Sequence, residues 1–271
     1  MLFQDLIRYG KTKQSLKRDD WLRVFDVPKR WFWHFYAVSV CWNGLLLVFY
    51  LCFMFQHRFQ PHPWLNKLVD ILTGEPTTVS QVPQLSTLMV QLLVWVHSLR
   101  RLLECLCVSV FSDAAMHVVQ YMFGLGYYIV LGLTVLCSDR LGKGTGTLFS
   151  QLDWFHVTGF ALFIWASLVQ HQSMVLLAKL RTGKSGTVKT LEHRVPVGGW
   201  FEVVSCPHYF AELLIYVSLS LVFGGLSLTW WLVVLYVLFN QALAAQLCHD
   251  LYISKHESYP KHRKAFIPFV L

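Results

Sequence analysis

Polar and ionisable side chains interrupt the long apolar stretches of this 271-residue chain. An ionisable group in such surroundings is usually paired with another group or lines a cavity. A chain that served only as an anchor would not need these residues. The pattern therefore indicates a site that binds something or carries out a reaction. The interrupting residues are Gln91, His97, His117, Gln120, Tyr121, Gln170, His171, Gln172, Glu212, Asn240, Gln241, Gln246 and His249.

Glu212 is the one carboxylate in this set, and it lies about one turn inside a helix expected to begin near His208. The helix dipole favours a carboxylate near a helix N-terminus. Two interpretations remain open at this point. Glu212 forms either a hydrogen bond between helices or a contact with a bound cofactor.

Several other residues have the spacing of a shared helix face. His117 and Tyr121 are four residues apart, which favours a packed core pair. Arg100 and Arg101 follow His97 at the end of an apolar stretch, as expected of arginines that snorkel to a membrane surface. Glu104 lies three residues after Arg101, which makes a local ion pair plausible.

The composition places the chain in the membrane class. Hydrophobic residues make up 55% and charged residues only 14%, with a mean hydropathy of +0.46, whereas roughly a quarter of the residues of a soluble domain are charged. The seven Cys residues contain no CxxC and lie mostly in apolar runs, so neither a disulfide framework nor a metal site is expected.

The apolar stretches predict an all-α integral membrane protein, a multi-span helical bundle without a Rossmann domain. They cover residues 31–55, 85–99, 116–137, 154–178 and 209–240. The last is too long for one crossing of about 20 residues. The pair Gly224–Gly225 divides it into a hairpin whose second helix reaches about residue 247, which gives six spans.

The distribution of Lys and Arg predicts the orientation of these spans. Only four of the 23 lie in loops on one side, namely Arg58, Lys67, Arg140 and Lys143. Because positive loops stay in the cytosol, we expect both ends of the chain to face the cytosol. This placement explains the net charge of +8 without nucleic acid. It divides the chain into a basic segment 1–30, a bundle 31–247 with a cytosolic cofactor loop 179–207, and a tail 248–271 packed on the bundle.

Three stretches resemble the membrane steroid 5α-reductase family: HRVPVGGWFEVVSCPHYFAE at 193–212, SYPKHRKAFIPF at 258–269 and HSLRRLLE at 97–104. Within it, FQDLIRYGKTK, FDVPKRWFWHFY and HVVQYMFGLGYY are most similar to the branch that acts on polyprenals. The resemblance covers essentially the whole chain. Family members have seven spans, and the additional one precedes FQDLIRYGKTK, so this chain is expected to hold the last six.

The resemblance implies an NADPH-dependent enzyme of the endoplasmic reticulum membrane. Family members reduce a double bond conjugated to a carbonyl by hydride transfer, while a hydrogen-bond donor polarises the carbonyl oxygen. The implied reaction converts polyprenal to dolichal, in support of dolichol synthesis for protein N-glycosylation. The implied partners are a long-chain polyisoprenoid lipid substrate and membrane lipids, without nucleic acid or an obligate protein partner.

The resemblance also implies site residues. Because no GxGxxG follows a strand, side chains must hold the cofactor phosphates. Ser98 stands where the steroid branch has a substrate-contacting Tyr, and His208 stands where an Asn is common. The expected carbonyl-polarising candidates are His97, Ser98 and Tyr121. The expected cofactor-binding residues are Arg181, Arg194, His208, Glu212, His249, Tyr252, Arg263 and Lys264.

Three alternatives stay open. The chain could be a 3-oxo-5α-steroid 4-dehydrogenase, which the absence of that Tyr disfavours. It could be a membrane methyltransferase of the prenylcysteine type, although the basic cluster fits a phosphate-bearing cofactor better. A transporter would be expected to show inverted repeats and broken helices, and we find no convincing example of either.

Overall fold

The computed structural model describes residues 7–8, 11–14, 20–55, 84–138, 148–183, 187–192, 194–225 and 227–270. Some of the segments on which the sequence predictions rest lie outside these residues. They include Arg58, Lys67, Arg140 and Lys143, parts of segment 1–30, residues 184–186 and 193 of the cofactor loop, and residue 271.

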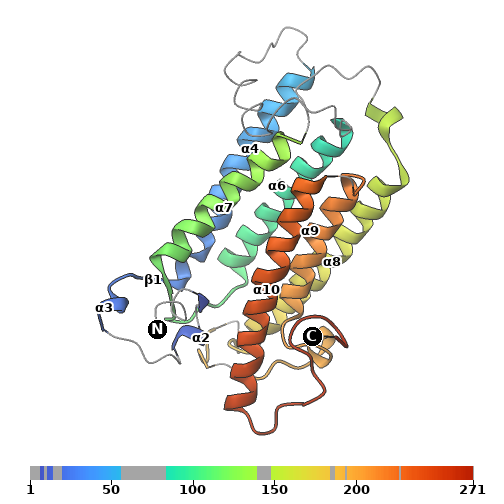
Figure 1. Cartoon of the computed structure of the whole chain (residues 1–271). Helices are drawn as coiled ribbons and strands as arrows, with labels where there is room; N and C mark the ends of the chain where they lie inside the picture. Colours follow the sequence, from blue (N-terminus) through green and yellow to red (C-terminus); the bar gives the residue numbers. More distant parts are fainter. Residues whose placement is uncertain are drawn as a thin grey trace.

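Within the described residues, six long helices lie side by side as a bundle (Figure 1). Helix α4 packs along α6 and α7, while α8 packs along α9 and α9 along α10. The α8–α9 approach is close at Gly159, where a Cβ would lie 2.8 Å from the Ser218 carbonyl oxygen. The helices are α4 (Trp33–Phe55), α6 (Gln84–Cys107), α7 (Val118–Leu136), α8 (Trp154–Lys179), α9 (Pro207–Val222) and α10 (Leu228–Lys255).

The predicted helices are confirmed, with differences at their ends. The hairpin between α9 and α10 turns at Gly224 and Gly225, whose φ values of 71° and 70° lie in the left-handed region that glycine tolerates. Helix α6 continues eight residues past the predicted end at residue 99, and α10 eight residues past 247. Both extensions carry polar residues, so hydropathy located the apolar spans but not the helix ends.

By length and composition, four helical segments can cross a membrane: Lys29–Met54, Val118–Leu136, Trp154–Lys179 and Leu228–Lys255. Helix α9 has 16 residues, and α6 carries Arg100, Arg101 and Glu104. Apolar side chains such as Leu45, Val130 and Phe239 are exposed on the outside of the bundle, as lipid-facing positions require. The chain is therefore an all-α, multi-pass integral membrane protein.

Short elements gather at one end of the bundle (Figure 1). Strands β1 (Asp26–Pro28) and β2 (Ala115–His117) pair antiparallel, and this two-stranded sheet is the only one in the described part of the chain. No Rossmann domain is present among these residues. Beside the sheet lie the one-turn helices α2 (Lys11–Gln14) and α3 (Asp20–Arg23), and η1 (Lys29–Phe32) follows β1.

The C-terminal residues return to the same end of the bundle (Figure 1). Phe266 is fully buried, with its ring 6.2 Å from Phe210 of α9. Val204 and Lys264 form a parallel bridge just after η3 (Gly199–Glu202). The remaining short element, η2 (Leu148–Gln151), precedes α8 and contacts α6. The tail thus packs on the loop that leads into α9.

Candidate active site

Two cavities adjoin near the end of the bundle where the short elements gather. The small cavity has a volume of about 200 Å³ and the large cavity about 520 Å³. Five side chains line both and form their shared wall: Phe32, Arg101, Met174, His208 and Tyr209. Ligands in the two cavities would therefore be in close proximity.

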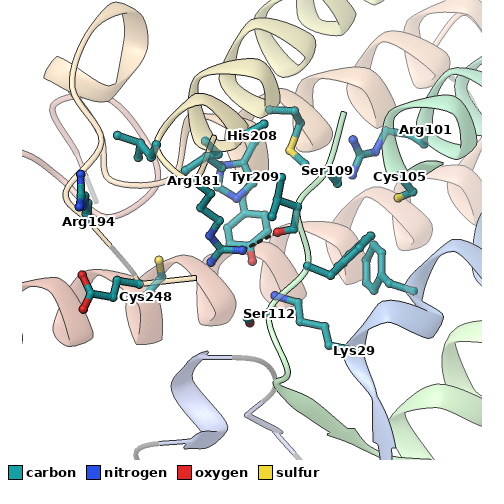
Figure 2. A pocket seen from close by; sticks show the side chains of 18 of the residues that line it. Lys29, Arg101, Cys105, Ser109, Ser112, Arg181, Arg194, His208, Tyr209 and Cys248 are labelled. Atoms are coloured by element: carbon teal, nitrogen blue, oxygen red, sulfur yellow. Dashed lines mark hydrogen bonds between the residues drawn. The ribbon is translucent and has the colours of Figure 1, made fainter. Parts of the chain in front are cut away.

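The small cavity is rich in cations. Lys29, Arg101, Arg181 and Arg194 line it, against one carboxylate, Glu192. Figure 2 shows Arg181 extending across the middle of the view, with Lys29 below it and Arg194 to one side. Guanidinium and ammonium groups arranged in this way suit a ligand that carries several phosphates.

Arg181 is held in place by the segment between α6 and β2. Its Nη1 donates a hydrogen bond of 2.5 Å to the Val110 carbonyl oxygen (Figure 2). Partial burial lowers the pKa of the guanidinium from its usual value, because the charged form is partly removed from water, while nearby Tyr252 acts in the opposite direction. An anion bound beside Arg181 would offset this desolvation.

The large cavity is apolar on most of its wall and polar on the rest. Phe123 of α7 and Val237 and Leu243 of α10 contribute apolar surface. The polar contributors come from all six long helices and are Tyr36, Arg101, Gln120, Tyr127, Tyr128, Gln170, His208, Tyr209, Glu212, Tyr216, Tyr236, Asn240 and Gln241. A lipid with one polar end fits such a surface.

Glu212 is central to the polar part of the wall. Gln170 Nε2 donates to Glu212 Oε2 at 2.5 Å and to the His208 carbonyl oxygen at 3.2 Å. His97 Nε2 lies 3.3 Å from Glu212 Oε1. The carboxylate is therefore fixed by α8 and α6, and it lines the large cavity as well. Both interpretations of Glu212, an interhelical contact and a ligand contact, are compatible with this geometry.

A second carboxylate, Glu104, orients the arginines of α6. It accepts from Arg100 Nη1 at 2.6 Å, from Arg101 Nη1 and from His171 Nδ1 at 2.9 Å. Arg101 Nε in turn donates to the Tyr36 hydroxyl at 3.3 Å. The plausible pair between Arg101 and Glu104 is thus present, and it is 94% and 97% buried. Arg101 does not snorkel to a surface but points into the shared wall.

The side chains of His97 and Ser98 contact different groups. His97 contacts Glu212, whose carboxylate lines the large cavity. Ser98 Oγ pairs with Ser39 Oγ at 2.6 Å and donates to the Val94 carbonyl oxygen at 2.8 Å. Ser98 is not among the residues that line the two cavities.

Tyr121 lies in an aromatic group outside the two cavities. Its hydroxyl is 2.8 Å from His34 Nδ1, and its ring packs against Trp31 and Phe35 with centroids 5.7 and 5.4 Å away. His117 does not pair with Tyr121, because its Nδ1 accepts from the Val119 N–H and caps α7.

The expected cofactor-binding residues fall into two groups. Arg181, Arg194, His208 and Tyr252 line the small cavity, and Glu212 lines the large one. His249, Arg263 and Lys264 do not line either cavity. The structure therefore places five of the eight residues in the cavity walls and the other three outside these walls.

The three remaining residues connect the tail to the loop that carries Arg194. Arg263 is 97% buried, donates to the Pro196 carbonyl oxygen at 2.7 Å and lies 3.1 Å from Glu202 Oε2. His249 Nδ1 is 2.6 Å from Ser205 Oγ. Lys264 contributes its backbone, whose carbonyl oxygen accepts from the Ser205 N–H at 2.8 Å.

Sequence reasoning missed several residues of the cavities, among them Arg101, Lys29 and Tyr36. Arg101 was interpreted as a snorkelling residue, Lys29 only as one of the cytosolic charges, and Tyr36 as part of an apolar span. Lys29 directly follows β1, and its backbone N–H donates to the Ala114 carbonyl oxygen at 2.8 Å. The pairing of β1 with β2 therefore fixes the position of Lys29. The one available signal was Glu104, since an acid three residues from Arg101 holds that arginine inside the bundle.

Known proteins are similar in sequence to most or all of this chain. The profile of a family described as 3-oxo-5-alpha-steroid 4-dehydrogenase matches residues 114–271. Polyprenal reductase of Danio rerio is 60% identical over 272 residues, covering 100% of this chain and 88% of its own length. The Xenopus tropicalis protein of the same name is 56% identical, covering 99% and 88%, and that of Homo sapiens 51% identical, covering 99% and 86%.

These matches and the helical bundle define the class, a membrane-embedded oxidoreductase. The chain belongs to the 3-oxo-5-alpha-steroid 4-dehydrogenase family, which confirms the family resemblance of its motifs. The family match over residues 114–271 includes all eight expected cofactor-binding residues, but not Lys29, Tyr36 and Arg101. The whole-length relatives extend the similarity over those residues too.

Proposed function

We propose that this chain reduces the double bond conjugated to the aldehyde of a long-chain polyprenal, giving dolichal, with NADPH as the hydride donor. Relatives from fish, frog and human carry the name Polyprenal reductase and align along nearly the whole chain. The observation that carries the proposal is the shared wall between a cation-lined cavity and an apolar one.

The residues of the small cavity fit a phosphorylated dinucleotide. Arg181 and Arg194 would hold its phosphates, with Lys29 and Arg101 adding positive charge. Glu212, which lines the large cavity, would accept hydrogen bonds from the carboxamide end where that end passes His208 of the shared wall. Bound NADPH supplies a hydride. A side-chain cradle of this kind replaces the glycine-rich turn of a dinucleotide-binding fold.

The large cavity fits the aldehyde-bearing end of the substrate. Its apolar wall removes isoprene units from water, and its polar part could accommodate the aldehyde. A cavity of about 520 Å³ holds only a terminal part of a long polyisoprenoid, so the rest of the chain lies in the bilayer. Saturation of the conjugated bond requires a hydride at the β-carbon, a proton at the α-carbon and stabilisation of the charge on the carbonyl oxygen.

The three cofactor-site candidates that line neither cavity have an indirect role in this proposal. His249, Arg263 and the Lys264 backbone fix the tail to the segment 196–205. That segment follows Arg194, so these contacts hold a phosphate-binding side chain in position. Among the candidates for the carbonyl donor, His97 is the one with a polar contact to a cavity-lining side chain, Glu212, although His97 itself lines neither cavity.

We further propose that the chain resides in the endoplasmic reticulum membrane with both ends in the cytosol. The small cavity is lined by Lys29 of η1, which directly follows β1. The bundle end with β1 also holds α2, α3 and the C-terminal residues (Figure 1). A cytosolic cofactor would enter from that side. Accessibility of cysteines introduced at residues 21 and 261 to a membrane-impermeant reagent, before and after permeabilisation, tests this orientation.

The test of the activity uses the full chain purified into lipid nanodiscs. Incubation with a polyprenal and NADPH should yield dolichal at a rate proportional to protein, with none in the absence of NADPH. A Δ4-3-oxo steroid serves as the alternative substrate, since the family name refers to that chemistry. Turnover of the steroid without turnover of the polyprenal would replace the proposed function with the steroid activity.

A further inference from the structure

Tyr36 of α4 faces the large cavity and contacts a buried cation. The residue is 4% exposed and lines the large cavity. Its hydroxyl oxygen accepts from Arg101 Nε at 3.3 Å, and the guanidinium carbon lies 5.2 Å from the ring centroid. Because the oxygen is the acceptor in this contact, Arg101 leaves the O–H hydrogen free to donate. A bound carbonyl oxygen would compete for that hydrogen with Tyr128, whose side chain also interacts with Tyr36 and whose ring centroid lies 5.6 Å away.

Arg101 has little freedom to turn away from Tyr36. Its Nη1 donates to Glu104, whose carboxylate also accepts from Arg100 and His171. Both Arg101 and Glu104 are more than 90% buried. A cation fixed in a region of low dielectric acts strongly on neighbouring charge and need not reorganise during a reaction.

We propose that the Tyr36 hydroxyl donates the hydrogen bond that polarises the substrate carbonyl, with Arg101 and Glu104 as its positioning residues. This inference rests on the proposed reduction of an unsaturated aldehyde. Tyr36 lines the substrate cavity alone, whereas Arg101 lines both cavities. The donor is thus on the substrate side of the shared wall.

The step balances without a further reagent. A hydride from the reduced dinucleotide adds to the β-carbon, the double bond opens, and its electron pair moves toward the carbonyl oxygen to give an enolate. The Tyr36 O–H stabilises that oxygen and keeps its own proton. The α-carbon then takes a proton from water, the carbonyl reforms, and a proton from the solvent neutralises the hydroxide that is left. Loss of the hydride leaves the dinucleotide in its oxidised form. The substrate gains one hydride and one proton.

Other hydroxyl groups near the site are less suited to this role. Ser98 Oγ pairs with Ser39, and the Tyr121 hydroxyl lies 2.8 Å from His34 Nδ1, and neither residue lines the large cavity. Tyr127, Tyr128 and Tyr216 also line the large cavity, but none of them has a contact with Arg101 among the described hydrogen bonds. They are the rival donors that the experiment must separate from Tyr36.

The experiment measures single-turnover oxidation of NADPH by polyprenal in nanodiscs, with NADPH affinity measured separately by fluorescence. We expect Tyr36→Phe to slow hydride transfer by about 100-fold, the usual effect of removing one such donor, with NADPH affinity unchanged. Tyr50→Phe is the matched control, because Tyr50 is fully buried in the same helix and loses the same atom. A rate for Tyr36→Phe equal to that of Tyr50→Phe overturns the inference, as does a larger loss in Tyr127→Phe, Tyr128→Phe or Tyr216→Phe.

A double-mutant comparison tests the positioning role of Arg101. Arg101→Lys keeps the charge but removes the Nε donor, so we expect it to slow the step by about tenfold, with little further loss when it is added to Tyr36→Phe. Losses that multiply would show that Arg101 acts independently of Tyr36. Should Tyr36→Phe fail to fold, replacing Tyr36 with 3-fluorotyrosine, a stronger acid of similar shape, should raise the rate, and an unchanged rate overturns the inference.

The inference and the proposed function fail in different ways. A wild-type chain that does not reduce polyprenal with NADPH removes the function itself. A wild-type chain that does, together with a Tyr36→Phe variant of equal rate, removes only the assignment of the donor.

Discussion

Replacing Glu212 by Gln tests the carboxylate that lines the large cavity. The change keeps the shape of the side chain and removes its charge. An amide oxygen can still accept from Gln170, which now lies 2.5 Å away, but it no longer offers a charged acceptor to His97 or to a cofactor amide. Losing one buried hydrogen bond to a charged group costs about 1.5–3 kcal/mol, which corresponds to about a 10- to 150-fold effect.

The substitution should weaken cofactor binding and leave protein abundance nearly unchanged. We expect the KM for NADPH to rise by about 10- to 150-fold, with the amount of protein recovered by size-exclusion chromatography nearly unchanged. Glu192→Gln is the matched control, because Glu192 lines the small cavity but is exposed. The KM of this variant for NADPH should change by less than a factor of about three. If abundance falls in step with activity, Glu212 serves as an interhelical contact and the assignment is wrong.

Arg194→Ala should raise the KM for NADPH by about tenfold with little change in kcat, whereas Lys189→Ala, an exposed residue of the same loop, should not. Arg263→Lys should weaken NADPH binding and expose the tail to protease, because a lysine cannot reach both partners of the guanidinium. The Gly198 N–H and, to a lesser degree, Arg263 hold the pKa of the Glu202 carboxyl below its usual value. Its contribution to tail attachment is therefore present above about pH 4.3, the ordinary value, and lost as the pH falls through the lower folded pKa. Limited proteolysis across that range measures the change.

Hydropathy and charge predicted the six long helices because each span is nearly continuous in apolar residues. The Gly224–Gly225 turn was predictable for the same reason, as glycine is the residue that tolerates a positive φ. The ends of α6 and α10 were not predictable in this way. Each helix continues through charged residues, and a hydropathy pattern cannot distinguish a polar helix from a loop.

The site was only partly predictable, because family position identifies residues but not their direction. Arg263 and His249 occupy expected positions, yet their side chains contact Pro196 and Ser205 rather than a cavity. Tyr36 looks like any aromatic residue of an apolar span. Its contact with Arg101 arises from the packing of α4 on α6, which joins residues 65 positions apart.

The central claim is that cationic side chains at one end of the bundle bind a phosphorylated dinucleotide beside an apolar cavity. Titrating the purified, folded chain in nanodiscs with NADPH and, separately, with NADH tests it most directly. We predict saturable binding of NADPH that weakens with increasing salt and a lower affinity for NADH. A chain that stays folded but binds neither dinucleotide would contradict the account.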